Sequence, residues 1–130
     1  MPSFGDRSMK AATSCSHKCQ LVLHEAIKHF DFSVICGHRG RKKQTEAFNA
    51  GKSQLEFPDS NHNSNPSHAF DVVPYPEGFA APYDRFFEMA SYILAAAAKK
   101  GVKLRWGGHW KNFSGNGEMD RDWAHFEEIE

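Results

Sequence analysis

The chain has 130 residues and a mass of 14.7 kDa, which is the size of one domain with its own hydrophobic core. Lys and Arg together number 16, as do Asp and Glu, so the balanced charge argues against a non-specific nucleic-acid binder or a polybasic membrane binder. The longest apolar stretch, 92–98, is far shorter than the roughly 20 residues that span a bilayer. Three cysteines fit reduced thiols better than a disulfide framework.

The hydrophobic pattern of the first half predicts helices and one strand. Residues 1–12 look irregular or weakly helical, and residues 21–30 carry the apolar stripe of a helix that Ser14 or Ser16 could cap. Residues 32–36 predict a short buried strand. Residues 41–50 predict a helix that stops at a glycine, and a polar loop with two prolines follows over 52–67.

The second half alternates strands with one long helix. Residues 69–73 predict a strand, and a helix begins at residue 82 or 83 and ends at residue 100. A strand over 102–106, a glycine-rich loop to about residue 120, and a short strand over 123–127 complete the chain. Because helices and strands are mixed without a βαβ rhythm, we expect one α+β domain over residues 1–130.

Two ionisable residues lie in segments that otherwise have the composition of buried strands. Asp71 lies between Phe70 and Val72, and His125 lies between aromatic residues in the segment 123–126. A buried carboxylate needs a partner or a metal ion. With a histidine in the adjoining loop, these residues suit a zinc site of two histidines and one carboxylate. A hydrogen-bonded core histidine and an aspartate at a strand end are the alternative interpretation.

Three short motifs follow one another along the chain: Ser60-Asn61-His62, Ala69-Phe70-Asp71 and Asp122-Trp123-Ala124-His125. They resemble the zinc motifs of the M15 family of peptidoglycan peptidases, whose pattern is S-x-H, then A-x-D, and later D/E-x-x-H. The similarity covers roughly residues 32 to 127. The segments 51–54, 74–76 and 104–108 resemble the phage endolysin branch, whose members are L-alanyl-D-glutamate peptidases.

The resemblance implies a fold and a set of site residues. The fold is the α+β fold, with a small antiparallel sheet and flanking helices, that D,D-peptidases share with the hedgehog signalling domain. The implied Zn²⁺ ligands are His62, Asp71 and His125. Asp122 is implied as the general base, and Arg39 as the cation that faces the scissile carbonyl or a substrate carboxylate. Ser60 and Gln44 are implied as substrate-binding or supporting contacts.

Two assignments have rivals. Residues three apart in a regular strand point to opposite faces, so Asp122 and His125 share a site only if a turn or bulge precedes the strand. Glu127 would lie on the His125 face, and it is the alternative base or a residue that orients the ligand. His68 is the alternative ligand to His62. No role carries over for the 107–119 loop, where the branch commonly has Asp in place of His109, and a Ca²⁺ site over 115–120 is an open alternative.

These observations predict a monomeric zinc peptidase that cuts the stem peptide of bacterial peptidoglycan, with L-Ala–D-Glu as the favoured bond. Residues 1–10 show no secretory signal, so we expect a phage endolysin that waits in the host cytoplasm and reaches the cell wall in the periplasm after release. We expect no nucleic-acid partner and no stable membrane insertion. The alternatives are a D-Ala-D-Ala carboxypeptidase or dipeptidase of the same family and a non-catalytic zinc-bearing binding domain.

Overall fold

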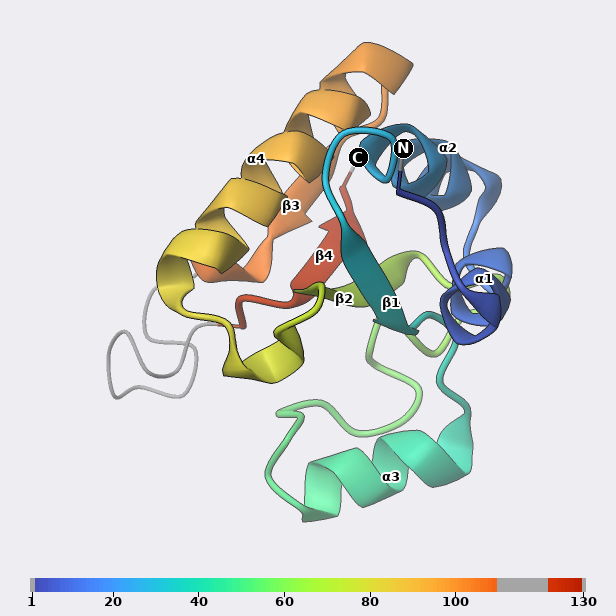
Figure 1. Cartoon of the computed structure of the whole chain (residues 1–130). Helices are drawn as coiled ribbons and strands as arrows, with labels where there is room; N and C mark the ends of the chain where they lie inside the picture. The colour runs from blue at the N-terminus through green and yellow to red at the C-terminus, as the bar shows by residue number, and fades with distance from the viewer. Residues whose placement is uncertain (1, 110–121, 130) are drawn as a thin grey trace.

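In the part of the chain that the structure describes, four strands form one antiparallel sheet in the order β1-β2-β4-β3 (Figure 1). They are β1 (Phe32–Cys36), β2 (Ala69–Pro74), β3 (Leu104–Trp106) and β4 (His125–Glu128). These bounds come from a computed structural model, which describes residues 2–109 and 122–129. The last strand of the chain therefore lies inside the sheet, between β2 and β3. The predicted α+β class with a small antiparallel sheet is confirmed.

Four α-helices and two short 3₁₀ turns surround the sheet in the described part of the chain. The helices are α1 (Asp6–Thr13), α2 (His17–Ala26), α3 (Arg41–Asn49) and α4 (Tyr83–Lys100), and the turns are η1 (Gly78–Ala80) and η2 (Gly107–His109). The Ser16 side chain caps α2 by accepting a hydrogen bond from the Cys19 backbone. Helix α3 lies apart from the other helices, beyond the loop that leads to β2 (Figure 1). Within the described residues, no helix has the length and apolar character to cross a membrane.

The two faces of the sheet carry different side chains. Phe70, Val72 and Phe126 are fully buried in a core shared with α2 and α4, and the rings of Phe70 and Phe126 stack with centroids 5.4 Å apart. Asp71 and His125 alternate with these residues along β2 and β4, so they point to the opposite face. One face of the sheet therefore packs the core, and the other carries polar chemistry.

The structure differs from the predicted elements where contacts between distant parts of the chain determine where a helix or strand forms. Residues 6–13 form a regular helix because Ser8 accepts a hydrogen bond from the Val34 backbone, which attaches α1 to β1. The strand predicted over 102–106 starts only at residue 104, because the Val102 N–H completes the end of α4 by bonding to Ala97 O. Phe87 is an apolar residue of α4, but it lies 50% exposed and makes a T-shaped contact with the Trp106 ring.

Candidate active site

Three side chains from separate parts of the chain meet beside the sheet. Asp71 on β2 and His125 on β4 are direct cross-strand partners, and His62 reaches them from the loop before β2. His62 Nε2 lies 3.2 Å from both Asp71 Oδ1 and His125 Nδ1, and the latter two atoms are 3.0 Å apart. Ligand atoms around a tetrahedral zinc ion lie roughly 3.3–3.6 Å from one another. The three atoms therefore form a triangle close to the size that zinc requires.

The hydrogen bonds behind the two histidine rings assign their tautomers. His62 Nδ1 lies 2.7 Å from Gly37 O, and His125 Nε2 lies 2.7 Å from Glu127 Oε1. Both partners are acceptors, so each of these nitrogens carries the ring hydrogen. The facing nitrogens, His62 Nε2 and His125 Nδ1, then both present lone pairs. A shared proton or a metal ion between them would relieve the repulsion of the two lone pairs, so this donor set is compatible with a metal ion.

The electrostatics of the triangle also favour a cation. Burial opposes ionisation of Asp71, but its hydrogen bonds with His125 and His62 outweigh burial and hold its pKa well below the usual range. Burial would lower the pKa of both histidines, yet bonding to Asp71 raises the pKa of His62 to about 10 and that of His125 to about 9. The ionised Asp71 thus stabilises positive charge at the point where the three side chains meet.

Gly37 positions the carbonyl that orients His62. A Cβ atom at this residue would lie 2.3 Å from Ser14 Oγ and 2.4 Å from Ala11 O. Only a glycine therefore lets the chain after β1 pass this close to the end of α1. The close approach places Gly37 O within hydrogen-bond distance of the His62 ring.

Glu127 orients the other histidine. It is the cross-strand partner of Arg105, whose Nε donates to Glu127 Oε2 at 2.9 Å, while Glu127 Oε1 accepts from His125. Burial would raise the pKa of Glu127, but the hydrogen bonds from His125 and Arg105 lower it. Both carboxylate oxygens are thus engaged. Of its two predicted roles, this geometry fits the orientation of His125 rather than proton transfer.

Asp122 approaches the triangle from the turn before β4. The His125 N–H bonds to Asp122 O at 3.3 Å, and this turn brings the Asp122 carboxylate within 4.8 Å of the ligand atoms of Asp71 and His125. Gly107 makes room for the turn, because a Cβ there would lie 2.2 Å from Asp122 O. Burial, and next the charge of Asp71, raise the pKa of Asp122. A carboxylate with a raised pKa beside the site is suited to general-base chemistry.

Arg39 faces the same point from the loop after β1. Its Nη2 donates to Asp71 Oδ2 at 3.4 Å, and its Nη1 donates to Gln44 Oε1 at 3.1 Å. Its backbone N–H bonds to His62 O at 2.7 Å, which couples the two loops. The guanidinium therefore lies where it can stabilise negative charge near the triangle.

Gln44 is completely buried and hydrogen-bonds only within the protein. Its Oε1 accepts from Arg39 and from Asn63 Nδ2, and its Nε2 donates to Ser53 Oγ at 2.9 Å and to Leu55 O at 2.6 Å. The amide is fully used by these four bonds. Of its two predicted roles, the structure therefore gives Gln44 the supporting one. Its buried amide holds Arg39 and the 52–55 loop, and no donor or acceptor of the amide remains for a substrate.

Of the remaining residues named from the sequence, Ser60 lies at the site and His68 lies away from it. Ser60 lines the cavity, but its hydroxyl accepts the His62 N–H at 3.2 Å, which supports the ligand loop. His68 is exposed and bonds to Glu128 at 2.8 Å, away from the triangle. The side chain of His109 and the predicted calcium segment 115–120 lie outside the described residues.

Cys36 is a neighbour of the site that sequence reasoning did not single out. Its Sγ lies 3.8 Å from His62 Nδ1 and 3.8 Å from Arg39 Nη2. Burial would raise the pKa of this thiol, but the hydrogen bond with His62 lowers it. Cys36, His62 and Asp71 together form a group that could hold a metal ion. Because the sulfur lies beside Nδ1 rather than Nε2, it falls outside the His62–Asp71–His125 triangle. In the sequence, the feature that could have pointed to Cys36 is its position directly before Gly37, three residues before the predicted site residue Arg39.

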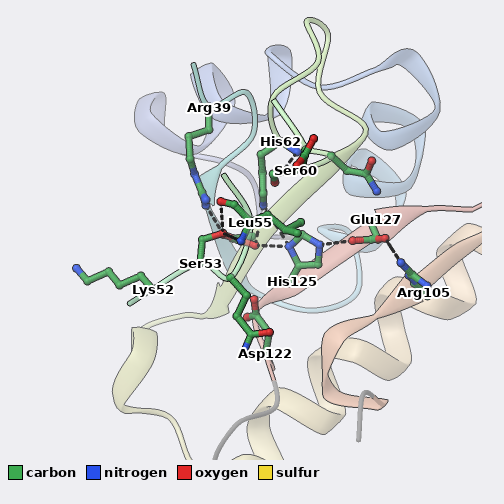
Figure 2. Close-up of a pocket in the computed structure, with 14 residues that line it drawn as sticks. Arg39, Lys52, Ser53, Leu55, Ser60, His62, Arg105, Asp122, His125 and Glu127 are labelled. Carbon is green, nitrogen blue, oxygen red and sulfur yellow. Dashed lines mark hydrogen bonds and ion pairs between the residues drawn. The ribbon is translucent and has the colours of Figure 1, made fainter. Parts of the chain in front are cut away.

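A cavity of about 310 Å³ opens over the triangle. Its walls combine the sheet residues with the loop around residues 52–61 (Figure 2). Arg39, Asp122 and the three triangle residues all line it. A peptide that enters this cavity therefore meets a candidate metal site, a carboxylate base and a guanidinium in one place.

Comparisons with known proteins place this chain in a family. A family described as phage L-alanyl-D-glutamate peptidase matches residues 2–130. The crystal structure of the L-Ala D-Glu endopeptidase ChiX from Serratia marcescens is similar, with a TM-score of 0.79 and 28% identity over 98% of this chain and 90% of that chain. No curated protein matches the chain. The chain thus belongs to the phage L-alanyl-D-glutamate peptidase family, as the resemblance of its motifs predicted.

Proposed function

We propose that this protein is a zinc peptidase that hydrolyses the L-alanyl-D-glutamate bond of the peptidoglycan stem peptide. One observation carries the metal assignment: two histidine lone pairs converge on an ionised aspartate, with each ring fixed from behind by an acceptor. The membership in a family of L-alanyl-D-glutamate peptidases supports the choice of bond.

Each residue of the site has a chemical role in this proposal. A zinc ion held by His62, Asp71 and His125 would supply a Lewis acid that polarises the scissile carbonyl and acidifies water. Asp122 takes a proton from the attacking water and passes it to the leaving amine nitrogen, a role that its raised pKa supports. Arg39 keeps its charge and stabilises the negative charge that develops on the carbonyl oxygen.

We also propose that the enzyme acts as an endolysin, which waits in the host cytoplasm and cuts the cell wall after release. The phage family supports this role. All the groups assigned to the chemistry come from a single chain, which supports action as a monomer.

Digestion of purified peptidoglycan tests the proposed function. The zinc-loaded protein should release fragments with new amino-terminal D-glutamate, read by mass spectrometry, and a chelator should abolish them until zinc is restored. Free D-alanine as the product would instead favour the D-Ala-D-Ala carboxypeptidase alternative. Zinc binding without any product would favour a non-catalytic binding domain.

A further inference from the structure

Lys52 is a cation that lines the cavity and has no partner in the part of the chain that the structure describes. It is exposed, and its amino group makes no hydrogen bond or ion pair with any residue in 2–109 or 122–129. The other two cations of the cavity wall are engaged, since Arg39 bonds to Asp71 and Gln44, and Arg105 bonds to Glu127. In the view of Figure 2, Lys52 and Arg105 lie on opposite sides of the His125 ring.

Hydrogen bonds hold the backbone that carries Lys52 in place, although its side chain contacts no partner among the described residues. The Lys52 N–H bonds to Ala47 O at 2.9 Å, which joins the residue to α3. The next residues are attached to the site itself, because Gln44 Nε2 donates to Ser53 Oγ and to Leu55 O. Gln44 Oε1 also accepts a hydrogen bond from Arg39. The loop over residues 52–55 and the Arg39 guanidinium are therefore held by the same buried side chain. These hydrogen bonds fix the part of the cavity wall from which the Lys52 side chain extends.

The chemistry of the substrate calls for such a charge. A D-glutamate joined through its amino group has two carboxyl groups, and continuation of the peptide chain uses one of them. The other remains an anion close to the nitrogen at which the bond is cut. A carboxylate that enters a partly desolvated cavity needs a charge-assisted hydrogen bond to replace its water. Lys52 is the cavity-lining cation that is available for it among the described residues.

We propose that Lys52 binds the free carboxylate of the D-glutamate on the amine side of the scissile bond and thereby makes the site selective for an acidic residue there. This inference rests on the proposed function. It adds to it the residue that distinguishes D-glutamate from its uncharged carboxamide analogue.

Two synthetic peptides test the proposal. In each, acetylated L-alanine precedes D-glutamate, and the chain continues from the glutamate side chain to L-lysine. One peptide keeps the α-carboxylate and the other carries an α-carboxamide. The ratio of kcat/KM for the two is measured for the wild type, Lys52→Met, Lys52→Arg and the control Lys42→Met. Lys42 is exposed on α3, two residues from Gln44 and hence on the opposite face of the helix, and it does not line the cavity.

The wild type should prefer the carboxylate peptide on the order of 10-fold to 100-fold, the range of a charge-assisted hydrogen bond. Lys52→Met should bring the ratio close to one, mainly through a loss of kcat/KM on the carboxylate peptide. Lys52→Arg and Lys42→Met should keep most of the preference. An unchanged preference in Lys52→Met would overturn the assignment and leave the proposed function intact. A wild type that cleaves neither peptide would overturn both, so the two failures are distinguishable.

Discussion

The site has a half that lies on the sheet and a half that lies on loops, and these are held in place by different means. Asp71 and His125 are cross-strand partners, so the register of β2 and β4 fixes their separation. His62 and Arg39 lie on segments without regular structure. Their positions depend on side-chain and backbone hydrogen bonds, from His62 to Gly37 O and from Arg39 to Gln44.

Because the two halves are held by different means, changes in each should affect a different property of the site. The sheet half contributes two of the three triangle atoms and the carboxylate that orients His125, so changes there should act first on metal affinity. The loop half carries the third triangle residue, His62, together with Arg39 and, through Gln44, the wall that faces the substrate. Changes in the support of that wall should therefore act on turnover while the metal stays bound.

Removal of a sheet ligand should have the largest effect. His125→Ala takes away one corner of the triangle, so zinc content should fall from about one ion per chain to nearly none. Peptidoglycan hydrolysis should fall by at least about 10³-fold. Elemental analysis after dialysis and a turbidity assay measure both. The control His68→Ala should keep its zinc, and tight zinc binding by His125→Ala would contradict the ligand set.

Asp122→Asn should separate catalysis from metal binding. The amide cannot take a proton from water, so kcat should fall on the order of 10²-fold to 10⁴-fold while zinc content is kept. Asp84→Asn, an exposed change on α4, is the matched control. Full activity in Asp122→Asn would remove Asp122 from the mechanism and return Glu127 as the candidate base.

Glu127→Gln should lower zinc affinity by loosening the His125 ring, although all three ligands remain. The carboxamide lacks the charge that pairs with Arg105 and that holds the His125 ring hydrogen in place. Zinc affinity should drop about 10-fold to 100-fold in a competition titration with a chelating dye. Glu128→Gln, at the neighbouring position on β4, should leave the affinity unchanged. Equal affinities for the two variants would show that Glu127 does not orient the ligand.

Gln44→Met should disturb the loop half with the smallest effect on activity. The similar-sized side chain fills the space but leaves Arg39, Asn63 and Leu55 O without their buried partner. We expect a loss of about 1–3 kcal/mol in the free energy of unfolding and a fall on the order of 10-fold in kcat/KM, with zinc affinity nearly unchanged. Urea denaturation and kinetics on the acidic peptide check this. The control is Gln20→Met, which removes a hydrogen bond from Gln20 Nε2 on α2 to Cys15 O, outside the cavity wall. A loss of zinc instead would show that the two halves are not separable.

The two halves also differ in how well the sequence alone predicts their residues and contacts. A charged residue within an apolar strand is visible in a sequence, and so Asp71 and His125 can be recognised from their neighbours in the chain. Gln44 was implied only as a supporting or substrate-binding contact. Its partners at residues 39, 53, 55 and 63 come from three segments that no local pattern connects, so their convergence on one buried amide required the tertiary structure. The regular helix α1 was missed for a similar reason, because its stability comes from contacts with β1.

X-ray absorption spectroscopy of the zinc-loaded protein tests the central claim most directly. The His62–Asp71–His125 triangle predicts only nitrogen and oxygen neighbours at about 2.0–2.2 Å, two of them with the outer-shell scattering of imidazole rings. A sulfur neighbour at about 2.3 Å would place Cys36 among the ligands and contradict the triangle.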